Sequence, residues 1–180
     1  MATWNIDPAH SAADFVVKHM MFTKVRGNVP ITGGVINFDP ANPADASVEA
    51  TLDIANISTG AADRDTHLKS DDFFSVETFP TMTFKSTGVD VVNDNNANIT
   101  GDLTIRDVTK SVVLAVEFQG AGTNPWGQQV AGFEANITID REDFGLTWNQ
   151  ALETGGVLVG KEVKIELDIQ AAAAPEGDPA

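Results

Sequence analysis

Strict alternation of apolar and polar residues is the feature that most constrains the fold of this chain. In the segment SVEATLDI, residues 47–54, every second residue is apolar and polar residues stand between them. The same period recurs over residues 81–86, 97–105, 133–140 and 163–169. A period of two places successive side chains on opposite faces of an extended strand. The sequence therefore predicts antiparallel strands with one apolar face and one face in water.

Further strands follow from the same reasoning. They are predicted over residues 11–19, 25–39 and 111–120, with a break in the second at Pro30–Gly34. About eight strands would then need the same face covered, and the chain offers only short helix candidates, near 66–75 and 148–153. Closing one sheet into a barrel covers every apolar face and removes the sheet edges. A sandwich of two sheets is the alternative.

Composition and charge argue against several classes of partner and site. A formal net charge of −15 argues against nucleic acid, whose phosphates need a basic surface. The sequence shows no run of Lys and Arg dense enough to predict docking on anionic lipid. Because cysteine is absent, the chain has no disulfide, no thiolate nucleophile and no cysteine-based zinc site.

The domain organisation is simple. The 180 residues suit one domain over 1–170, followed by an acidic tail rich in Ala and Pro over 171–180 that we expect to be disordered. The first residues lack the basic region and apolar run of a signal peptide, and no apolar segment is long enough to span a membrane. A cytoplasmic location is therefore expected for the chain as given. A periplasmic or secreted location is expected only if a leader has been removed.

Several sequence blocks are more specific than the alternation. They are WNIDPAHS (4–11), FVVKH (15–19), VRG (25–27), RDTHLKSDDFF (64–74), PTMTFKS (80–86), GDLTIRDVTK (101–110) and DREDFGLTW (140–148). In this order, over roughly residues 3–170, they resemble the YceI-like family of bacterial lipid- or polyisoprenoid-binding barrels. The block at 64–74 carries the most distinctive part of the resemblance.

The resemblance implies an all-β fold, a single extended eight-stranded antiparallel barrel similar to a lipocalin, with one or two short helices. It also implies non-catalytic binding, storage or transport of a polyprenyl or isoprenoid-quinone type of lipid in the lumen. No cofactor would be required beyond that bound lipid. Two alternatives stay open: a hydrolytic or metal-dependent enzyme on an amphiphilic substrate, and a packed barrel that acts as an interaction module. A homodimer is also left open.

The residues expected to line the lumen lie on the inward face of the strands or in the segment that follows residue 63. They are Phe15, Val17, Ile36, Phe38, Leu52, Ile54, Leu68, Phe73, Phe74, Met82, Phe84, Leu103, Ile105, Leu114, Phe118, Ile137, Trp148, Ile165 and Leu167. Burial of an apolar tail there would contribute about 0.8 kcal/mol per CH₂ group. The competing interpretation is that the same side chains pack against one another as a dry core.

The segment around residue 65 also carries charged groups. The spacing of Asp63, Asp65 and His67 would place three metal ligands on one face of an extended segment. A zinc site needs further ligands and supporting hydrogen bonds, which the sequence does not supply, so no metal site is predicted. Asp65 or Thr66 is expected instead to cap a short helix, with Arg64 paired to a carboxylate. Arg64 and His67 are the candidate polar groups at the cavity mouth.

No catalytic residue is predicted. His10 and Ser11 could be combined with an acid into a hydrolytic triad. The chain has neither a G-x-S-x-G turn nor a glycine-rich oxyanion loop beside that serine.

Structural roles are expected for three arginines and two tryptophans. Arg26, Arg106 and Arg141 are expected to make bidentate pairs with carboxylates. Trp148 is expected to close one end of the barrel, and Trp126 to be exposed on a hairpin.

With 11 Lys and Arg dispersed along the chain, the sequence shows no strong anion site. A neutral head group such as a quinone is therefore favoured over a free diphosphate.

Overall fold

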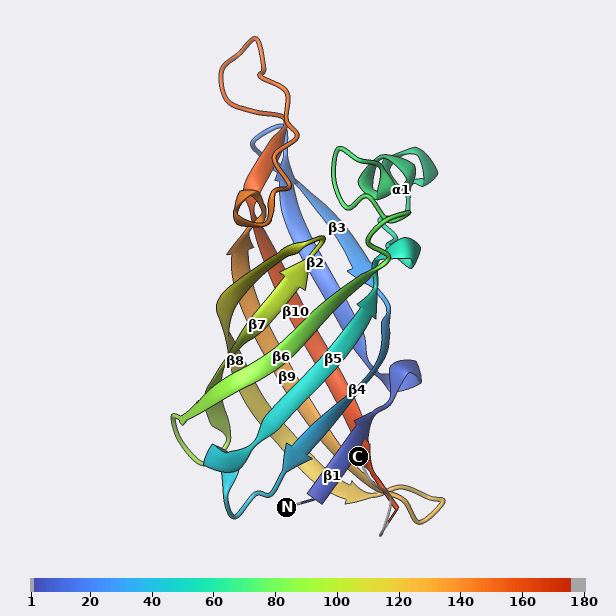
Figure 1. The fold of residues 1–180 in the computed structure, drawn as a ribbon, viewed down its shortest axis with the longest axis vertical. Coiled ribbons are helices and arrows are strands. Elements are labelled where there is room, and N and C mark those ends of the chain that lie inside the picture. Colours follow the sequence, from blue (N-terminus) through green and yellow to red (C-terminus); the bar gives the residue numbers. More distant parts are fainter. Residues whose placement is uncertain (1, 176–180) are drawn as a thin grey trace.

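The computed structural model describes residues 2–175, and its main feature is one antiparallel sheet that closes into an elongated barrel (Figure 1). The strands are β1 (Ala2–Ile6), β2 (Ala12–His19), β3 (Thr23–Val29), β4 (Ile31–Phe38), β5 (Ser47–Asp53), β6 (Thr81–Val91), β7 (Asn96–Ile105), β8 (Val108–Thr123), β9 (Gln129–Asp140) and β10 (Val159–Ala173). The helix α1 spans Ala62–Lys69. Short 3₁₀ turns are η1 (Pro8–His10), η2 (Pro43–Asp45), η3 (Ile54–Asn56) and η4 (Arg141–Phe144).

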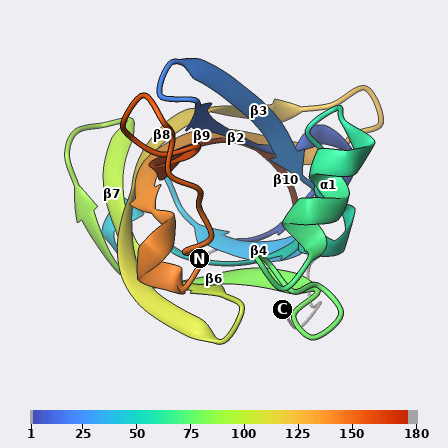
Figure 2. The same ribbon diagram turned by 90° about the horizontal axis from the view of Figure 1, so that it is seen from above.

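Eight strands close the barrel. Hydrogen bonds join them in the order β1-β4-β5-β6-β7-β8-β9-β10, and β10 pairs with β1 to complete the ring. β10 is longer than its neighbours on this side: its C-terminal residues pair with β1, and its preceding residues pair with β2. β2, with β3 beside it, therefore extends the wall of the barrel beyond the end of β1. Figure 2 shows the barrel from above, with α1 at the rim. The predicted eight-stranded antiparallel barrel is confirmed.

The break predicted at Pro30–Gly34 is confined to Pro30, which lies between β3 and β4, whereas residues 31–34 belong to β4. Proline has no N–H to donate to a sheet ladder. Its carbonyl still accepts a hydrogen bond of 2.8 Å from the Asp53 N–H, so the chain stays attached to the end of β5 at the break.

Both helix candidates need correction. α1 begins before the predicted 66–75 segment and ends at Lys69, after which backbone hydrogen bonds such as Ser75 N–H to Ser70 O (2.9 Å) hold a series of turns. Residues 148–153 are not helical. There the Asn149 side chain bonds both backbone groups of Val159, and Gly155 and Gly156 reverse the chain at positive φ. These contacts replace the hydrogen bonds that a helix would make.

The end of the domain also needs correction. β10 continues to Ala173, whereas the sequence predicted that the tail begins at residue 171. Ala171 is fully buried and pairs with Ile6 of β1 and Ala131 of β9. A run of alanines carries no alternation, so the pattern could not show that the strand continues. Residues 176–180 of the predicted tail lie outside the described part of the chain.

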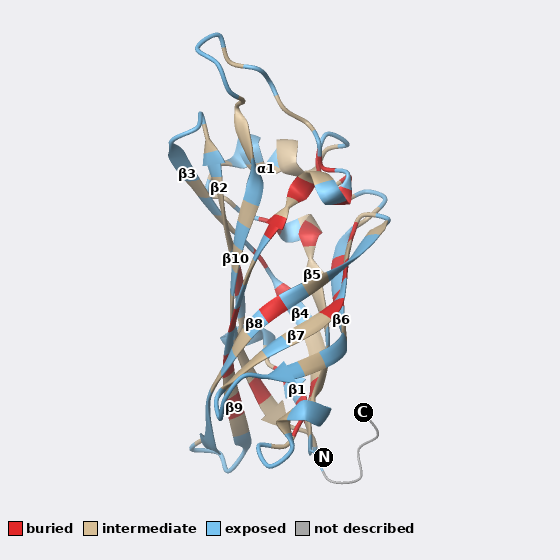
Figure 3. Ribbon diagram, turned by 90° about the vertical axis from the view of Figure 1, so that its left-hand side faces the viewer, coloured by how far each residue is buried: buried red, intermediate tan, exposed pale blue. Residues whose placement is uncertain are grey.

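Buried and exposed residues alternate along the strands (Figure 3). The two ends of the interior differ in how completely side chains fill them. At the end that holds the chain termini, Trp4 and Ile6 pack with an aromatic layer of Phe38, Phe118 and Phe133. The ring centroids of this layer are 5.0–5.5 Å apart, a contact range favourable for aromatic pairs. That end of the barrel is therefore closed by its own side chains.

Two adjacent glycines on β4 provide a test of this packing. A Cβ atom at Gly34 would collide with the Glu49 carbonyl oxygen and lie 2.7 Å from Ile6 Cδ1, whereas a Cβ at Gly33 would meet nothing within 4 Å. Overpacking of this kind costs about 1–3 kcal/mol. We therefore expect Gly34→Ala to lower the free energy of unfolding in urea by that amount. Gly33→Ala should change it by less than about 0.5 kcal/mol, as open surface sites do. Equal losses in the two variants would contradict the packing described.

Candidate functional site

A cavity of about 420 Å³ lies inside the barrel at the end that carries α1. Strands β2, β3, β5, β6, β7, β9 and β10 contribute to its wall, together with α1 and the loops on either side of the rim. Most lining side chains are aliphatic or aromatic. The polar ones are Lys18, His19, Asp63, Arg64, His67 and Arg141. Small-molecule sites in proteins typically measure about 300–1,000 Å³ and combine apolar walls with a few polar groups.

The structure divides the predicted lining residues into two sets. Those that line the cavity are Phe15, Val17, Leu52, Leu68, Phe73, Phe74, Met82, Ile105, Trp148, Ile165 and the polar Arg64 and His67. Those that pack in the core without lining the cavity are Ile36, Phe38, Ile54, Phe84, Leu103, Leu114, Phe118, Ile137 and Leu167. Alternation identifies the inward face of a strand, but it does not tell whether side chains from opposite walls meet. Contact of the first set with a ligand stays a prediction.

Aromatic side chains cover the cavity at the α1 end. The His67 ring lies edge-on to Phe73 and to Trp148, with centroids 5.0 and 4.6 Å apart. Its Nε2 atom lies 2.9 Å from the Asp72 carboxylate, which fixes the ring from the solvent side. Trp148 comes from the loop between β9 and β10, so this contact joins that loop to α1 across the end of the barrel. Trp148 thus occupies the position that the sequence predicted.

Thr59 attaches α1 to the rim. Asp65 Oδ1 accepts hydrogen bonds from the Thr59 N–H (2.8 Å) and hydroxyl (2.6 Å), and these bonds lower the pKa of Asp65. Arg64 donates to the Thr59 hydroxyl and carbonyl oxygens at 2.7 and 2.8 Å. The predicted roles were therefore wrong in detail. Arg64 bonds Thr59 and not a carboxylate. The N-cap position of α1 is held by Ala61, so no side chain caps the helix.

The helical conformation also separates Asp63, Asp65 and His67, whose spacing would suit a metal site on an extended segment. Asp63 and Asp65 are two positions apart on α1, which places them on different sides of a helix. Asp65 is bonded to Thr59, and His67 to Asp72. Within residues 2–175, no group of three His, Asp or Glu side chains is arranged to hold a metal ion.

Arg141 is a cavity residue that the sequence did not propose. It is only 4% exposed, at the start of η4, and its guanidinium lies 5.9 Å from the centre of the Phe73 ring. Nε donates to the Gly160 carbonyl (2.8 Å), and the two terminal nitrogens donate to the Leu146 and Val159 carbonyls. Burial lowers the pKa of Arg141, an effect that its neighbours Glu142 and Asp140 oppose.

The predicted carboxylate pairs are not formed. No ion pair involves Arg26, Arg106 or Arg141 among the residues described. Arg106 instead donates to the Gly145 carbonyl at 3.4 Å. A signal for the position of Arg141 was present in the sequence, since it continues the inward parity of Ile137 and Ile139 on β9. A cation that follows a row of inward apolar residues is the sequence pattern that would have identified Arg141 as an inward residue.

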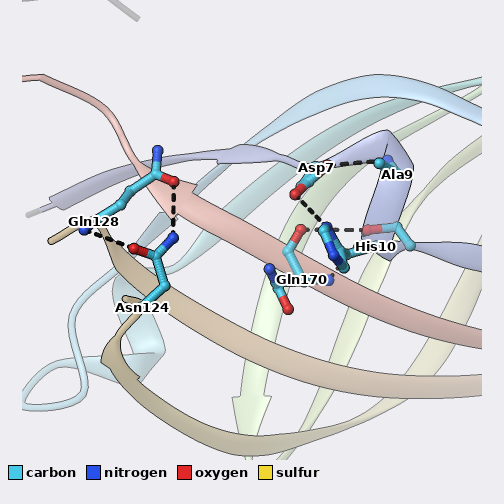
Figure 4. Close-up of polar contacts among 7 residues, drawn as sticks. Asp7, Ala9, His10, Asn124, Gln128 and Gln170 are labelled. Atoms are coloured by element: carbon cyan, nitrogen blue, oxygen red, sulfur yellow. Dashed lines mark hydrogen bonds and ion pairs between the residues drawn. The ribbon is translucent and has the colours of Figure 1, made fainter. Parts of the chain in front are cut away.

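The candidate triad lies at the opposite end of the barrel and is not assembled (Figure 4). His10 Nδ1 pairs with Asp7 Oδ2 at 2.8 Å, which lowers the pKa of Asp7. Ser11 Oγ bonds the backbone of Gln170, at 3.3 Å to the carbonyl and 3.1 Å from the N–H. The serine therefore holds η1 against β10, and its hydroxyl is not oriented by the histidine. Asn124 and Gln128 bond each other on the nearby hairpin, where Trp126 is 86% exposed as predicted.

Comparison with known proteins gives a consistent result. Residues 4–171 match the family described as the YceI-like domain. UPF0312 protein SAS2572 of Staphylococcus aureus (strain MSSA476) is 39% identical over 167 residues, which cover 92% of this chain and 95% of that protein. No helix in the described part of the chain has the length and apolar character needed to cross a membrane.

Solved structures show the same barrel. BcnA of Burkholderia cenocepacia superposes with a TM-score of 0.80 at 26% identity, covering 92% of this chain and 98% of that one. The YCEI protein of Campylobacter jejuni gives 0.74 at 30% identity, covering 88% and 90%. A polyisoprenoid binding domain from Saccharophagus degradans gives 0.73, covering 97% and 100%; at 13% identity this likeness concerns the fold alone.

Proposed function

The chain belongs to the YceI-like family, and from its cavity we propose that it binds and carries an amphiphile with an isoprenoid-type tail, without altering it chemically. The observation that carries the proposal is an apolar cavity of about 420 Å³ whose polar groups gather at the α1 end. An apolar tail gains about 0.8 kcal/mol for each CH₂ group it buries, so the walls need no polar contacts to hold it. A barrel filled entirely by its own side chains would have no such space.

The packed end of the barrel limits the cargo. The aromatic layer of Phe38, Phe118 and Phe133 stands between the cavity and the chain termini. We therefore expect the enclosed part of the tail to be short, and to end before this layer.

The polar end of the cavity indicates the head group. A guanidinium has five N–H donors, and backbone carbonyls occupy three of those on Arg141. The remaining donors suit a head that accepts hydrogen bonds, such as a carboxylate, a phosphate or a quinone carbonyl. Arg141 thus offers an acidic head a buried cation, whereas the dispersed Lys and Arg of the sequence had favoured a neutral head.

Native mass spectrometry of the freshly purified protein tests the proposal. We expect one lipid-sized adduct per chain, which solvent extraction releases and which can then be identified. The recovered lipid should have the same mass before and after prolonged incubation with the protein, since a carrier does not convert its cargo. An unloaded mass that stays unchanged after incubation with prenyl quinones and fatty acids would contradict the proposal.

A further inference from the structure

The turn between β2 and β3 lies at the cavity end of the barrel (Figure 1), and its large apolar side chains are exposed. Met20, Met21 and Phe22, here called the apolar tip, are 36%, 54% and 77% exposed. Side chains of this size in water, side by side at a projecting turn, typically mark an interaction surface.

The backbone of the apolar tip is held in an uncommon conformation. Met20 and Met21 have φ of +57° and +71°, a region that bulky residues rarely adopt and that hairpins usually give to Gly or Asn. Hydrogen bonds from Met20 N–H to Leu158 O (2.8 Å) and from Phe22 N–H to His19 O (3.3 Å) fix the turn. The fold therefore supports a strained turn that presents Phe22 to the outside.

A basic groove runs along the outer surface next to the apolar tip. Its volume is about 1050 Å³, and it lies over β2, β3 and β10. It contains five of the 11 Lys and Arg of the chain but only three of the 26 Asp and Glu. The cations, here called the basic face, are Lys18, Lys24, Arg26, Lys161 and Lys164, and all are exposed. The acids are Asp14, Glu162 and Glu166.

The charges of the basic face are arranged by position along the strands. Lys18 stands directly opposite Lys24, one pair away from the apolar tip, whereas Asp14 and Glu166 pair with each other farther from it. Like charges directly opposite each other destabilise a sheet. Of the five cations of the basic face, Lys161 alone has a carboxylate partner among the described residues, Glu142 at 3.5 Å. The repulsion would be relieved by an anionic surface against this face.

We propose that the apolar tip and the basic face dock the barrel on an anionic phospholipid bilayer. Phe22 and the two methionines enter the interface while the lysines contact lipid phosphates, a combination that binds membrane surfaces. The remaining surface carries the acidic excess of a chain with net charge −15, and repulsion turns it away from the bilayer. Docking brings the cavity end to the membrane; exchange of cargo there rests on the proposed function, but docking itself does not.

Flotation of the full chain with vesicles tests the charge requirement. We expect at least tenfold stronger partitioning onto phosphatidylcholine vesicles that contain phosphatidylglycerol than onto pure phosphatidylcholine, with a decrease at high salt. Lys18→Gln with Lys24→Gln should reduce the partitioning at least tenfold. Lys85→Gln with Lys110→Gln removes the same charge from other strands and should leave it unchanged. Wild-type protein that does not bind, or equal losses in the two double variants, would overturn the proposal.

A second pair of variants, one at the apolar tip and one as its control, tests the role of the tip. Phe22→Ser should weaken vesicle binding several-fold, whereas Trp126→Ser, at the opposite end of the barrel, should have no effect. Unchanged melting temperatures would show that the variants are folded. Binding that survives Phe22→Ser would overturn the role of the tip. A lipid adduct without vesicle binding would contradict docking and leave the carrier function intact. Vesicle binding by a chain that never holds lipid would support docking and contradict the carrier function.

Discussion

Leu52→Trp is expected to empty the cavity of its cargo. Leu52 lies on β5 and its side chain lines the cavity, so an indole there would occupy the space that the tail requires. We expect the fraction of chains that carry a lipid adduct to fall at least tenfold in native mass spectrometry. The substitution should cost about 1–3 kcal/mol of stability, the usual effect of overpacking, and the barrel should stay folded.

Val113→Trp is the matched control for this substitution. Val113 is 52% exposed on β8, and a tryptophan there adds the same ring to the outside of the barrel. Its lipid occupancy should equal that of the wild type. Full occupancy in Leu52→Trp, with the same lipid recovered, would place the binding site outside the described cavity.

Leu103 shows how far the sequence could guide such an experiment. From alternation alone, Leu52 and Leu103 are equivalent inward residues, and a tryptophan at either would be expected to block the lumen. In the structure Leu103 is 7% exposed within the packed core and does not line the cavity. A tryptophan there would be expected mainly to strain the core. The strand pattern fixes the direction of a side chain, but the width of the space opposite it depends on the whole barrel.

Much of the fold could be predicted because each strand carries its own local signal. The errors fall where that signal is absent. Residues 148–153 have a composition that suits a helix, yet Asn149 bonds the first residue of β10 and draws the segment into a loop. Ala171 continues β10 without any polar residue to mark the alternation.

The functional surfaces were harder to predict because they combine distant residues. Lys18 and Lys164 are far apart in the sequence, so no local cluster marks the basic face that β2 and β10 bring together. The same limit explains why docking on anionic lipid was not expected from the sequence. Arg141 is a different case, since parity along β9 indicated its direction. Without the cavity, however, an inward arginine was most simply explained by a carboxylate partner.

Arg141→Met is expected to remove the preference of the cavity for acidic head groups. Hydrogen bonds to a charged group contribute about 1.5–3 kcal/mol, which corresponds to roughly a tenfold to hundredfold change in affinity. We therefore expect binding of a long-chain fatty acid to weaken by that factor, measured by calorimetry on delipidated protein. Binding of a neutral prenyl alcohol should change much less, because its tail contacts the same apolar walls.

The same variant is expected to lose stability. The Leu146, Val159 and Gly160 carbonyls would lose their donor, and a buried polar group without a partner costs about 1–3 kcal/mol. Removal of a buried charge offsets part of this loss. Arg141→Lys provides a second variant in which the charge is kept but the planar fork that reaches all three carbonyls is lost. Affinities should be compared at a temperature at which each variant is fully folded.

Arg106→Met separates a head-group contact from a general effect of charge at this end of the barrel. Arg106 bonds the Gly145 carbonyl but does not line the cavity, so its loss removes the same charge without removing a donor from the site. We expect fatty-acid affinity in this variant to stay near that of the wild type, and Arg141→Lys to retain more of it than Arg141→Met. If Arg141→Met bound the fatty acid as tightly as the wild type, the buried guanidinium would serve only to join η4 to β10. The head group would then have to be held by Arg64 or His67 at the rim.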